Sequence, residues 1–276
     1  MGTQDTLLSI GNHFNVSRTT VMNIVNRLLY FTLRLKKMYI KFPKTERDFE
    51  YVAEGFKKYP GVAGAIDGTH IFVTVKKEQQ DSYIDRYRRH SINLMVICDA
   101  SKMLTYAFVG FPGSAHDSRV FQNSLLYQEI EQHGPNSIFL DDQKYHIIGD
   151  SAFPLKTWLM TPYKGNNLTV SQKYHNYCLS AERVVVEHTI GTIKGRWRRL
   201  QYINTYHICK SIEIATAACV LHNFCLLNND IWAEQAVHDR WDVNNGDTEP
   251  FAGRIKRDRI KNMLHQQHQQ HDMLQY

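Results

Sequence analysis

Three acidic side chains stand where the sequence otherwise indicates buried, apolar structure. They are Asp67 in GAIDGTHIFV (64–73), Asp150 in YHIIGDSAF (145–153) and Glu187 in VVVEHTIG (184–191). A buried carboxylate is costly unless it is ion-paired, hydrogen-bonded or bound to a cation. If the three converge, they form the oxygen-only ligand set that Mg²⁺ and Mn²⁺ prefer.

Two such ions, about 4 Å apart, would activate a water nucleophile and stabilise the leaving 3′-oxygen of a phosphodiester. The simpler interpretation of Asp67 is that it ends a strand, since Asp-Gly is a common turn signal. Asp150 repeats the arrangement, with an apolar strand running into a glycine and then an acid at the strand's C-terminal end. Ligands gather at such ends in open α/β sheets, so the repetition favours a metal site.

The third acid has a nearby competitor, Glu182, on the same expected helix. Glu187 shares a helical face with Arg183 and Lys194, whereas Glu182 points about 140° away. Only one of the two glutamates can face the strand ends. Glu187 lies in the apolar stretch and is the predicted ligand, and Glu182 is expected to face solvent or to cap the helix.

The elements that must position these acids follow from the apolar pattern. We expect strands within residues 60–73, 93–100 and 103–110, arranged as an antiparallel meander. An amphipathic helix (117–130), a strand (145–153), a shorter apolar run (159–163) and a long helix (180–200) follow, and a further helix (211–229) packs on them. This order predicts an RNase H-like α/β core, a mixed sheet flanked by helices.

The first 29 residues predict a helix-turn-helix. An apolar-periodic helix leads to a turn at Asn15-Val16, and Ser17 is the expected N-cap of a second helix. Such a second helix would present Arg18, Asn23 and the threonines between them to a DNA groove. The alternative is an ordinary αα-hairpin that packs on the core.

The charge distribution also favours a nucleic-acid partner. The 276-residue chain has a formal charge of +6 and a pI of about 9.0, and its basic residues are clustered. The cluster IKGRWRRL (193–200) follows Glu187 on the long helix, so Lys194, Arg196, Arg198 and Arg199 are expected to hold a nucleic-acid backbone near the acids. No apolar run reaches the length of a membrane helix and no signal peptide is visible, which predicts an intracellular protein without a membrane partner.

A zinc site is the competing metal hypothesis. Cys219, His222 and Cys225 are each three residues apart, but that spacing on one helix is that of a core face, and no second pair has CxxC spacing. The chain also has no GxxxxGK loop and no GxSxG elbow, which excludes P-loop nucleotide hydrolysis and serine esterase chemistry.

Four ordered motifs, GAIDGTHI, GFPGSAHDSRVF, IIGDSAFPL and RVVVEHTIGTIKGRWRRL, resemble the DDE endonuclease domain of PIF/Harbinger transposases and of the transposase-derived HARBI nuclease-like proteins. The resemblance covers about residues 60–225. It implies that Asp67, Asp150 and Glu187 are the catalytic acids and metal ligands of a DNA endonuclease. His116 and Asp117 match a further family motif with a positional role, although Asp117 could instead be a helix N-cap.

The resemblance and the patterns together predict three regions: a helical, helix-turn-helix-like region (1–58), the endonuclease domain (59–230) and a basic, polar helical tail (231–276), in which the stretch HQQHQQHD (265–272) is expected to fray. They also imply a Myb/SANT-like DNA-binding partner, a homodimer, and residence in the nucleus, with the cytoplasm as the location when the partner is absent. The rival hypothesis is a DNA-binding adaptor that keeps the acids without using them.

Overall fold

The computed structural model describes residues 2, 5–85, 88–232 and 249–273. Within them, six strands form one mixed sheet in the order β3-β2-β1-β4-β5, and β6 pairs with β1. The strands are β1 (Val62–Val73), β2 (Ser91–Cys98), β3 (Leu104–Pro112), β4 (His146–Ile148), β5 (Leu159–Met160) and β6 (Tyr202–Ile203). The first three form the predicted antiparallel meander, and β4, β5 and β6 each pair in parallel.

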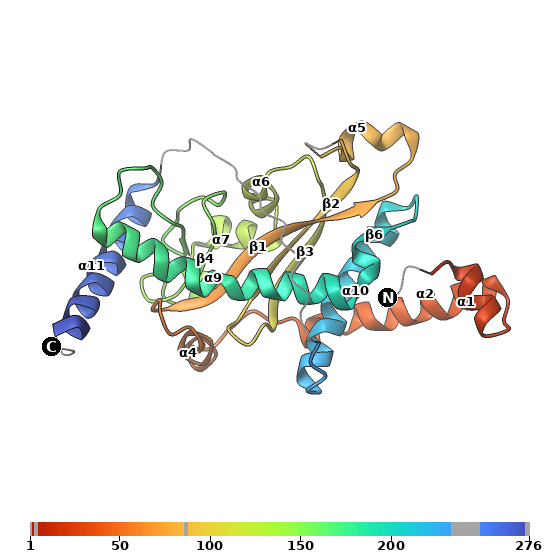
Figure 1. Cartoon of the computed structure of the whole chain (residues 1–276), viewed down its shortest axis with the longest axis horizontal. Coiled ribbons are helices and arrows are strands. Elements are labelled where there is room, and N and C mark those ends of the chain that lie inside the picture. Colours follow the sequence, from red (N-terminus) through yellow and green to blue (C-terminus); the bar gives the residue numbers. More distant parts are fainter. Residues whose placement is uncertain (1, 3–4, 86–87, 233–248, 274–276) are drawn as a thin grey trace.

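Helices flank this sheet (Figure 1), which confirms the RNase H-like α/β fold class. They are α1 (Leu7–His13), α2 (Arg18–Arg34), α3 (Lys36–Tyr39), α4 (Glu46–Gly55), α5 (Gln80–Tyr83), α6 (Asp117–Gln122), α7 (Leu125–His133), α8 (Asn136–Phe139), α9 (Val170–Arg196), α10 (Ile208–Leu227) and α11 (Phe251–Met273), with 3-10 turns η1 (Lys77–Gln79) and η2 (Arg198–Leu200).

The long helix α9 lies across one face of the sheet (Figure 1). Its apolar residues Val186, Ile190 and Ile193 belong to the same core cluster as Ala65 and Ile71 of β1. Alternate residues of a strand point to the same face, so Asp67, between Ala65 and Ile71, shares the face that α9 covers.

The other face of the sheet carries an aromatic core. Ile66 of β1 belongs to it, together with Phe49 of α4 and Phe121 of α6. The rings of Phe49 and Tyr145 stack with their centroids 4.8 Å apart, and Phe121 meets Trp158 at 5.7 Å. Both faces of β1 are therefore buried, which is why the strand reads as nearly continuous apolar sequence.

Several element boundaries differ from the expected ones. The single helix expected over 117–130 is broken, because Ser124 accepts a hydrogen bond from the backbone N–H of Tyr127 and starts α7. Helix α9 begins at Val170, ten residues before the expected start, because Thr169 and Gln172 form a capping box. The strand expected over 145–153 ends at Ile148.

The N-terminal segment forms the two predicted helices. The Ser17 hydroxyl accepts a hydrogen bond from the Thr20 backbone N–H at 3.0 Å and caps α2, and the turn before it places Asn15 at a positive φ of 50°. Figure 1 shows α1 and α2 extending away from the sheet, with the far end of α2 packed against α10. Whether this hairpin binds DNA stays a prediction.

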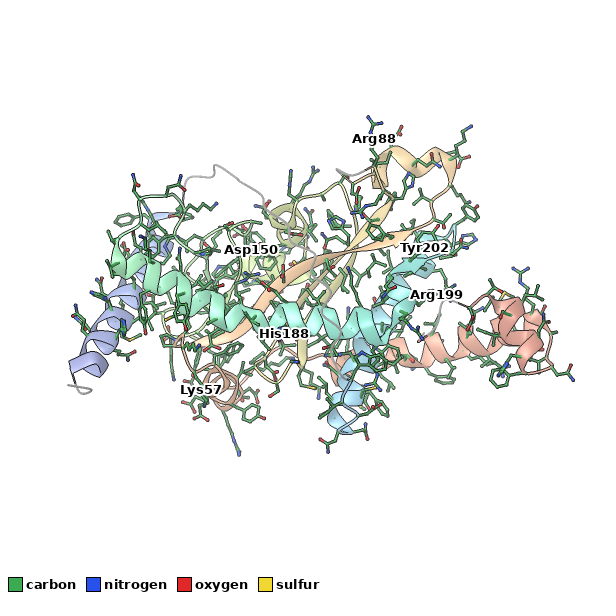
Figure 2. All side chains as sticks on the ribbon, in the orientation of Figure 1. Lys57, Arg88, Asp150, His188, Arg199 and Tyr202 are labelled. Atoms are coloured by element: carbon green, nitrogen blue, oxygen red, sulfur yellow. The ribbon has the colours of Figure 1, made fainter. Side chains whose placement is uncertain are left out.

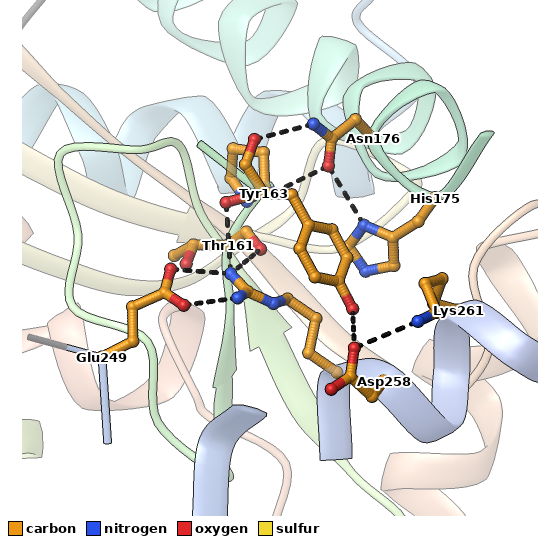
Figure 3. Close-up of polar contacts among 9 residues, drawn as sticks. Thr161, Tyr163, His175, Asn176, Glu249, Asp258 and Lys261 are labelled. Atoms are coloured by element: carbon orange, nitrogen blue, oxygen red, sulfur yellow. Dashed lines mark hydrogen bonds and ion pairs between the residues drawn. The ribbon is translucent and has the colours of Figure 1, made fainter. Parts of the chain in front are cut away.

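Helix α11, within the predicted C-terminal tail, packs on the core, and residues 233–248 and 274–276 of that tail lie outside the described residues. It lies against α9, and its Ile260 and Leu264 join the core cluster of that face. Figure 3 shows the polar contacts at this junction, in which the Tyr163 hydroxyl donates a hydrogen bond of 2.6 Å to Asp258 of α11. The Arg257 guanidinium lies 3.9 Å from the centre of the Tyr163 ring and pairs with Glu249.

Among the described helices, α10 alone is long and apolar enough to cross a membrane by length and composition. A core helix passes the same test, and 61% of the stretch is buried inside the protein. The Asn223 side chain fastens it to β3, accepting from the Leu104 backbone N–H at 2.8 Å and donating to the Leu104 carbonyl at 2.7 Å. All five cysteines of the chain are free thiols.

Candidate metal-dependent nuclease site

Strand β1 places Asp67 near its middle, so the expectation that this acid ends its strand is wrong. The antiparallel ladder with β2 runs without interruption from Ala65 to Phe72, and Gly68 lies within it as an ordinary strand residue. Asp67 is therefore held by a paired, central strand rather than by a turn. Its Oδ1 accepts a hydrogen bond from the Gly68 backbone N–H at 2.8 Å.

Asp150 comes next to Asp67 because β4 is parallel to β1. Ile148, the last residue of β4, pairs with Ala65, and two further steps along each chain lead to Asp150 and Asp67. Figure 2 shows Asp150 close to β1. The prediction that Asp150 follows the end of its strand is confirmed, and its Oδ1 accepts from the Ala152 N–H at 2.9 Å.

Next to Asp67, the edge of β1 that faces β4 and β6 has no paired strand among the residues that the structure describes. β4 ends at Ile148, and β6 pairs with β1 only at Phe72 and Val73. Asp67 lies between these two paired regions. The sheet topology thus brings the carboxylates of Asp67 and Asp150 close together at this edge of β1.

Helix α9 carries Glu187, and Arg183 of the same helix contacts both Glu187 and Asp67. The guanidinium of Arg183 lies 3.4 Å from Asp67 Oδ2 through one terminal nitrogen and 3.6 Å from Glu187 Oε1 through the other. Arg183 and Glu187 are four residues apart and so share a helical face. Glu187 remains half exposed, at 54%, whereas the Asp67 and Arg183 side chains are 19% and 12% exposed.

Glu182 is held elsewhere, as the helical geometry predicts. Its carboxylate accepts a hydrogen bond from the Lys58 backbone N–H. Glu182 is partly exposed, and its contact with the segment between α4 and β1 was not predicted from the sequence. Arg183 links Asp67 to Glu187, and the role of Glu187 as a metal ligand stays a prediction.

Burial raises the pKa of the Asp67 carboxyl to about 7. The positive charge of Arg183 acts in the opposite direction, and the negative charges of Asp150 and Asp117 add to the rise. A group whose pKa is displaced by burial and by specific charged neighbours marks a candidate functional site. The influence of Asp150 on Asp67 also indicates that the two carboxylates are close enough to interact.

Asp117 lies on the opposite face of β1 from Asp67. It is the first residue of α6, after the N-cap His116, so the alternative that Asp117 is itself the N-cap is wrong. The Asp117 Oδ1 accepts a hydrogen bond from Asn93 Nδ2 at 3.1 Å. A Cβ at Gly68 would lie 2.5 Å from that Oδ1, so only glycine lets Asp117 approach the strand this closely.

The three acids provide a donor set that fits a hard divalent cation, since it consists of carboxylate oxygens. As they are placed, no three Asp, Glu, His or Cys side chains in the described ranges lie close enough together to hold a metal ion. Arg183 stands between two of the three acids and contacts both. Its role as their shared ionic partner was not predicted from the sequence, although the four-residue spacing to Glu187 is a usable signal.

The competing zinc cluster is a core face, as its spacing predicts. His222 is buried and makes a hydrogen bond of 2.9 Å between its Nε2 and the Lys102 carbonyl. Burial lowers its pKa to about 4. Cys219 and Cys225 are also buried, and burial raises the pKa of each thiol.

The basic residues predicted to bind DNA occupy different environments. Arg18 and Asn23 are exposed on α2, whereas Lys194 is buried on α9. Arg196 pairs with Asp230 and is 15% exposed. Their role in DNA binding stays a prediction, and the exposed pair on α2 has the better access to a nucleic acid.

Two basic residues after α9, Arg198 and Arg199, form hydrogen bonds with residues near the N-terminus. Arg198 donates to the Gly2 carbonyl at 3.0 Å, and Arg199 donates to the Asp5 carbonyl at 3.4 Å. Arg198 is nevertheless exposed and Arg199 is partly so. These two arginines therefore connect the end of α9 with the segment that leads into α1.

Comparison with known proteins identifies a family whose match includes the three acids. The family model described as DDE superfamily endonuclease matches residues 66–223, which include the three acids. The protein named "Putative nuclease HARBI1" in Rattus norvegicus is 29% identical over 263 residues, covering 92% of this chain and 73% of that protein. Its Homo sapiens counterpart is 29% identical over 231 residues, 81% of this chain and 64% of its own length.

A plant relative also matches most of the chain. "Protein ALP1-like" of Arabidopsis thaliana is 24% identical over 254 residues, which cover 88% of this chain and 63% of that protein. The chain thus spans roughly two thirds of the length of these relatives. No solved structure was found to match it.

Proposed function

The chain belongs to the DDE superfamily endonucleases, in the transposase-derived HARBI-type family, and from this premise we propose that it is a divalent-metal-dependent nuclease that cleaves DNA phosphodiester bonds. The observation that carries the proposal is that the β1–β4 register brings Asp150 close to Asp67, and that Arg183 of α9 contacts both Asp67 and Glu187.

In this proposal Asp67, Asp150 and Glu187 are the metal ligands and the catalytic acids. Mg²⁺ or Mn²⁺ ions bound there would supply the activation of a water molecule and the neutralisation of charge on the scissile phosphate. The sheet fixes the two aspartates relative to each other, because both follow from one parallel register. Glu187 lies on α9, where Arg183 links it to Asp67.

DNA contacts are proposed for the basic residues Arg18, Asn23, Lys194, Arg196, Arg198 and Arg199. The first two support a docking role for the exposed hairpin, since α2 carries no acidic residue and its polar face is open to solvent. A Myb/SANT-like partner, a homodimer and a nuclear location, with the cytoplasm in the partner's absence, belong to the same proposal. Their support is the family resemblance.

The test is a nicking assay on supercoiled plasmid with Mg²⁺ or Mn²⁺. We expect the intact protein to nick, and Asp67→Asn, Asp150→Asn and Glu187→Gln each to lose at least 100-fold in rate, of the order seen when a group that stabilises transition-state charge is removed. Glu182→Gln is the matched control on the same helix, because this side chain contacts Lys58 instead of the site.

If the protein does not nick alone, the assay is repeated with a Myb/SANT-like partner. Equal nicking by Glu187→Gln and Glu182→Gln would remove Glu187 from the proposed ligands. No nicking under either condition, with DNA still bound, would replace the nuclease by the adaptor hypothesis, in which the acids are retained without catalysis.

A further inference from the structure

Arg183 has two carboxylate partners from two different elements. Its guanidinium spans from Asp67 on β1 to Glu187 one helical turn along α9. The side chain is only 12% exposed, and its Nε is buried and makes no hydrogen bond with the described residues. The interactions recorded for this buried cation are therefore those with the two proposed metal ligands.

Arg183 contacts the Asp67 oxygen other than the one that accepts the Gly68 backbone N–H. Oδ1 of Asp67 accepts the Gly68 backbone N–H, whereas Oδ2 is the atom that lies 3.4 Å from Arg183. An ion that approached Asp67 through Oδ2 would meet the guanidinium there. The same holds for Oε1 of Glu187, which lies 3.6 Å from the other terminal nitrogen.

Both contacts are long for charge-assisted hydrogen bonds, which typically measure about 2.7–2.9 Å. The guanidinium thus neutralises the two carboxylates mainly through charge rather than through tight, directional bonds. Such a partner can be displaced at lower cost than a bidentate fork on one carboxylate. Attraction between opposite charges at this separation is nevertheless substantial in a partly buried site.

Resting on the proposed function, we propose that Arg183 is an internal counter-cation of the acid site: it competes with divalent metal for the carboxylates of Asp67 and Glu187 and so weakens and sets the metal affinity. Arg183 is in this sense a positioning residue. A fixed positive charge beside the ligands opposes an incoming cation whether the guanidinium stays in place or moves aside.

The inference predicts an unusual direction of effect. Removing a residue that only supports the ligands weakens metal binding, because the ligands lose their orientation. Removing a competing cation strengthens it. Arg183→Met deletes the charge and keeps a long apolar side chain, whereas Arg183→Lys keeps the charge and loses the fork.

The experiment is a Mn²⁺ titration of the full chain, with free Mn²⁺ followed by electron paramagnetic resonance in the absence of DNA. We expect Arg183→Met to lower the Kd for Mn²⁺ about tenfold or more, and Arg183→Lys to stay within about threefold of the unmodified protein. Lys173→Met removes one positive charge from an exposed position of the same helix and is the matched control, for which no change is expected.

A circular dichroism spectrum and a thermal unfolding curve for each variant identify any that fail to fold. In that case Arg183→Gln, which is shorter and polar, replaces Arg183→Met. A Kd that is unchanged or raised in the charge-deleting variant overturns the counter-cation role while leaving the nuclease proposal intact. Absence of Mn²⁺ binding in every variant overturns both the counter-cation role and the proposal of a metal-dependent nuclease.

Discussion

Replacing Asp67 by asparagine should stabilise the protein at neutral and higher pH when metal is chelated. Burial, opposed by Arg183, raises the pKa of the Asp67 carboxyl from its ordinary value of 3.8 to about 7. The folded state therefore retains a proton that the unfolded state has already lost across this interval. Stability from this group is fully present below about pH 4 and is lost as the pH rises towards 7.

The size of the effect follows from the same displacement. Each pKa unit corresponds to about 1.4 kcal/mol, so ionised Asp67 costs the folded state about 4 kcal/mol above pH 7. Asparagine has nearly the shape of the protonated acid and carries no charge, so Asp67→Asn avoids this cost. We expect the variant to gain about 4 kcal/mol over the unmodified protein at pH 8 and about 1.5 kcal/mol at pH 5.

Urea denaturation in EDTA, followed by tryptophan fluorescence at pH 5, 6, 7 and 8, measures this difference. Asp81→Asn, an exposed acid of α5, is the control and should change stability by less than about 0.5 kcal/mol at each pH. A variant that is less stable than the unmodified protein at pH 8, or whose advantage does not grow with pH, would refute the reasoning about buried charge at β1.

Three further changes in the free energy of unfolding are expected from single substitutions and can be measured by urea denaturation. Gly68→Ala should cost about 1 kcal/mol, because its Cβ would lie 2.5 Å from Asp117 Oδ1, and the cost should shrink in an Asp117→Ala background. Arg257→Met should cost about 3–5 kcal/mol, since it leaves Glu249 unpaired at the α11 junction, and a loss below 1 kcal/mol would contradict this. Burial lowers the pKa of Lys256 to about 7, so the unfolded state binds more protons above pH 7, and stability should rise by about 2–3 kcal/mol from pH 7 to 9 relative to Lys256→Met.

The sequence predicts the meander of β1, β2 and β3 and offers a choice between two glutamates, because both rest on local patterns. Apolar runs separated by polar turns identify the meander, and helical geometry separates Glu187 from Glu182. The position of Asp67 within β1 could not be read in the same way. Asp-Gly is compatible with a turn, and the strand continues there because β2 pairs with β1 from Ala65 to Phe72, which is a tertiary property.

The contacts of the basic residues could not be predicted from local sequence patterns either. Arg196 and Asp230 are 34 residues apart, and Arg198 reaches the carbonyl of Gly2 at the other end of the chain. Neither contact produces a periodic pattern in the sequence that could predict it. The docking of α11 depends likewise on Arg257 meeting the segment after β5, so a polar, basic stretch that resembles a solvated tail in the sequence becomes part of the core packing.

The balance of charges at the site relates the cost of burying ionised Asp67 to the proposed binding of divalent metal. When ionised, Asp67, Asp150 and Glu187 carry three negative charges, and Arg183 supplies one positive charge between two of them. The pKa of Asp67 remains raised although Arg183 acts to lower it, so this single cation does not compensate for the burial. A purely structural site would be stabler with a neutral residue at this position. An acid kept in a paired central strand at such a cost is what the proposed metal-dependent function would require, because bound divalent cations would supply the positive charge that Arg183 alone does not.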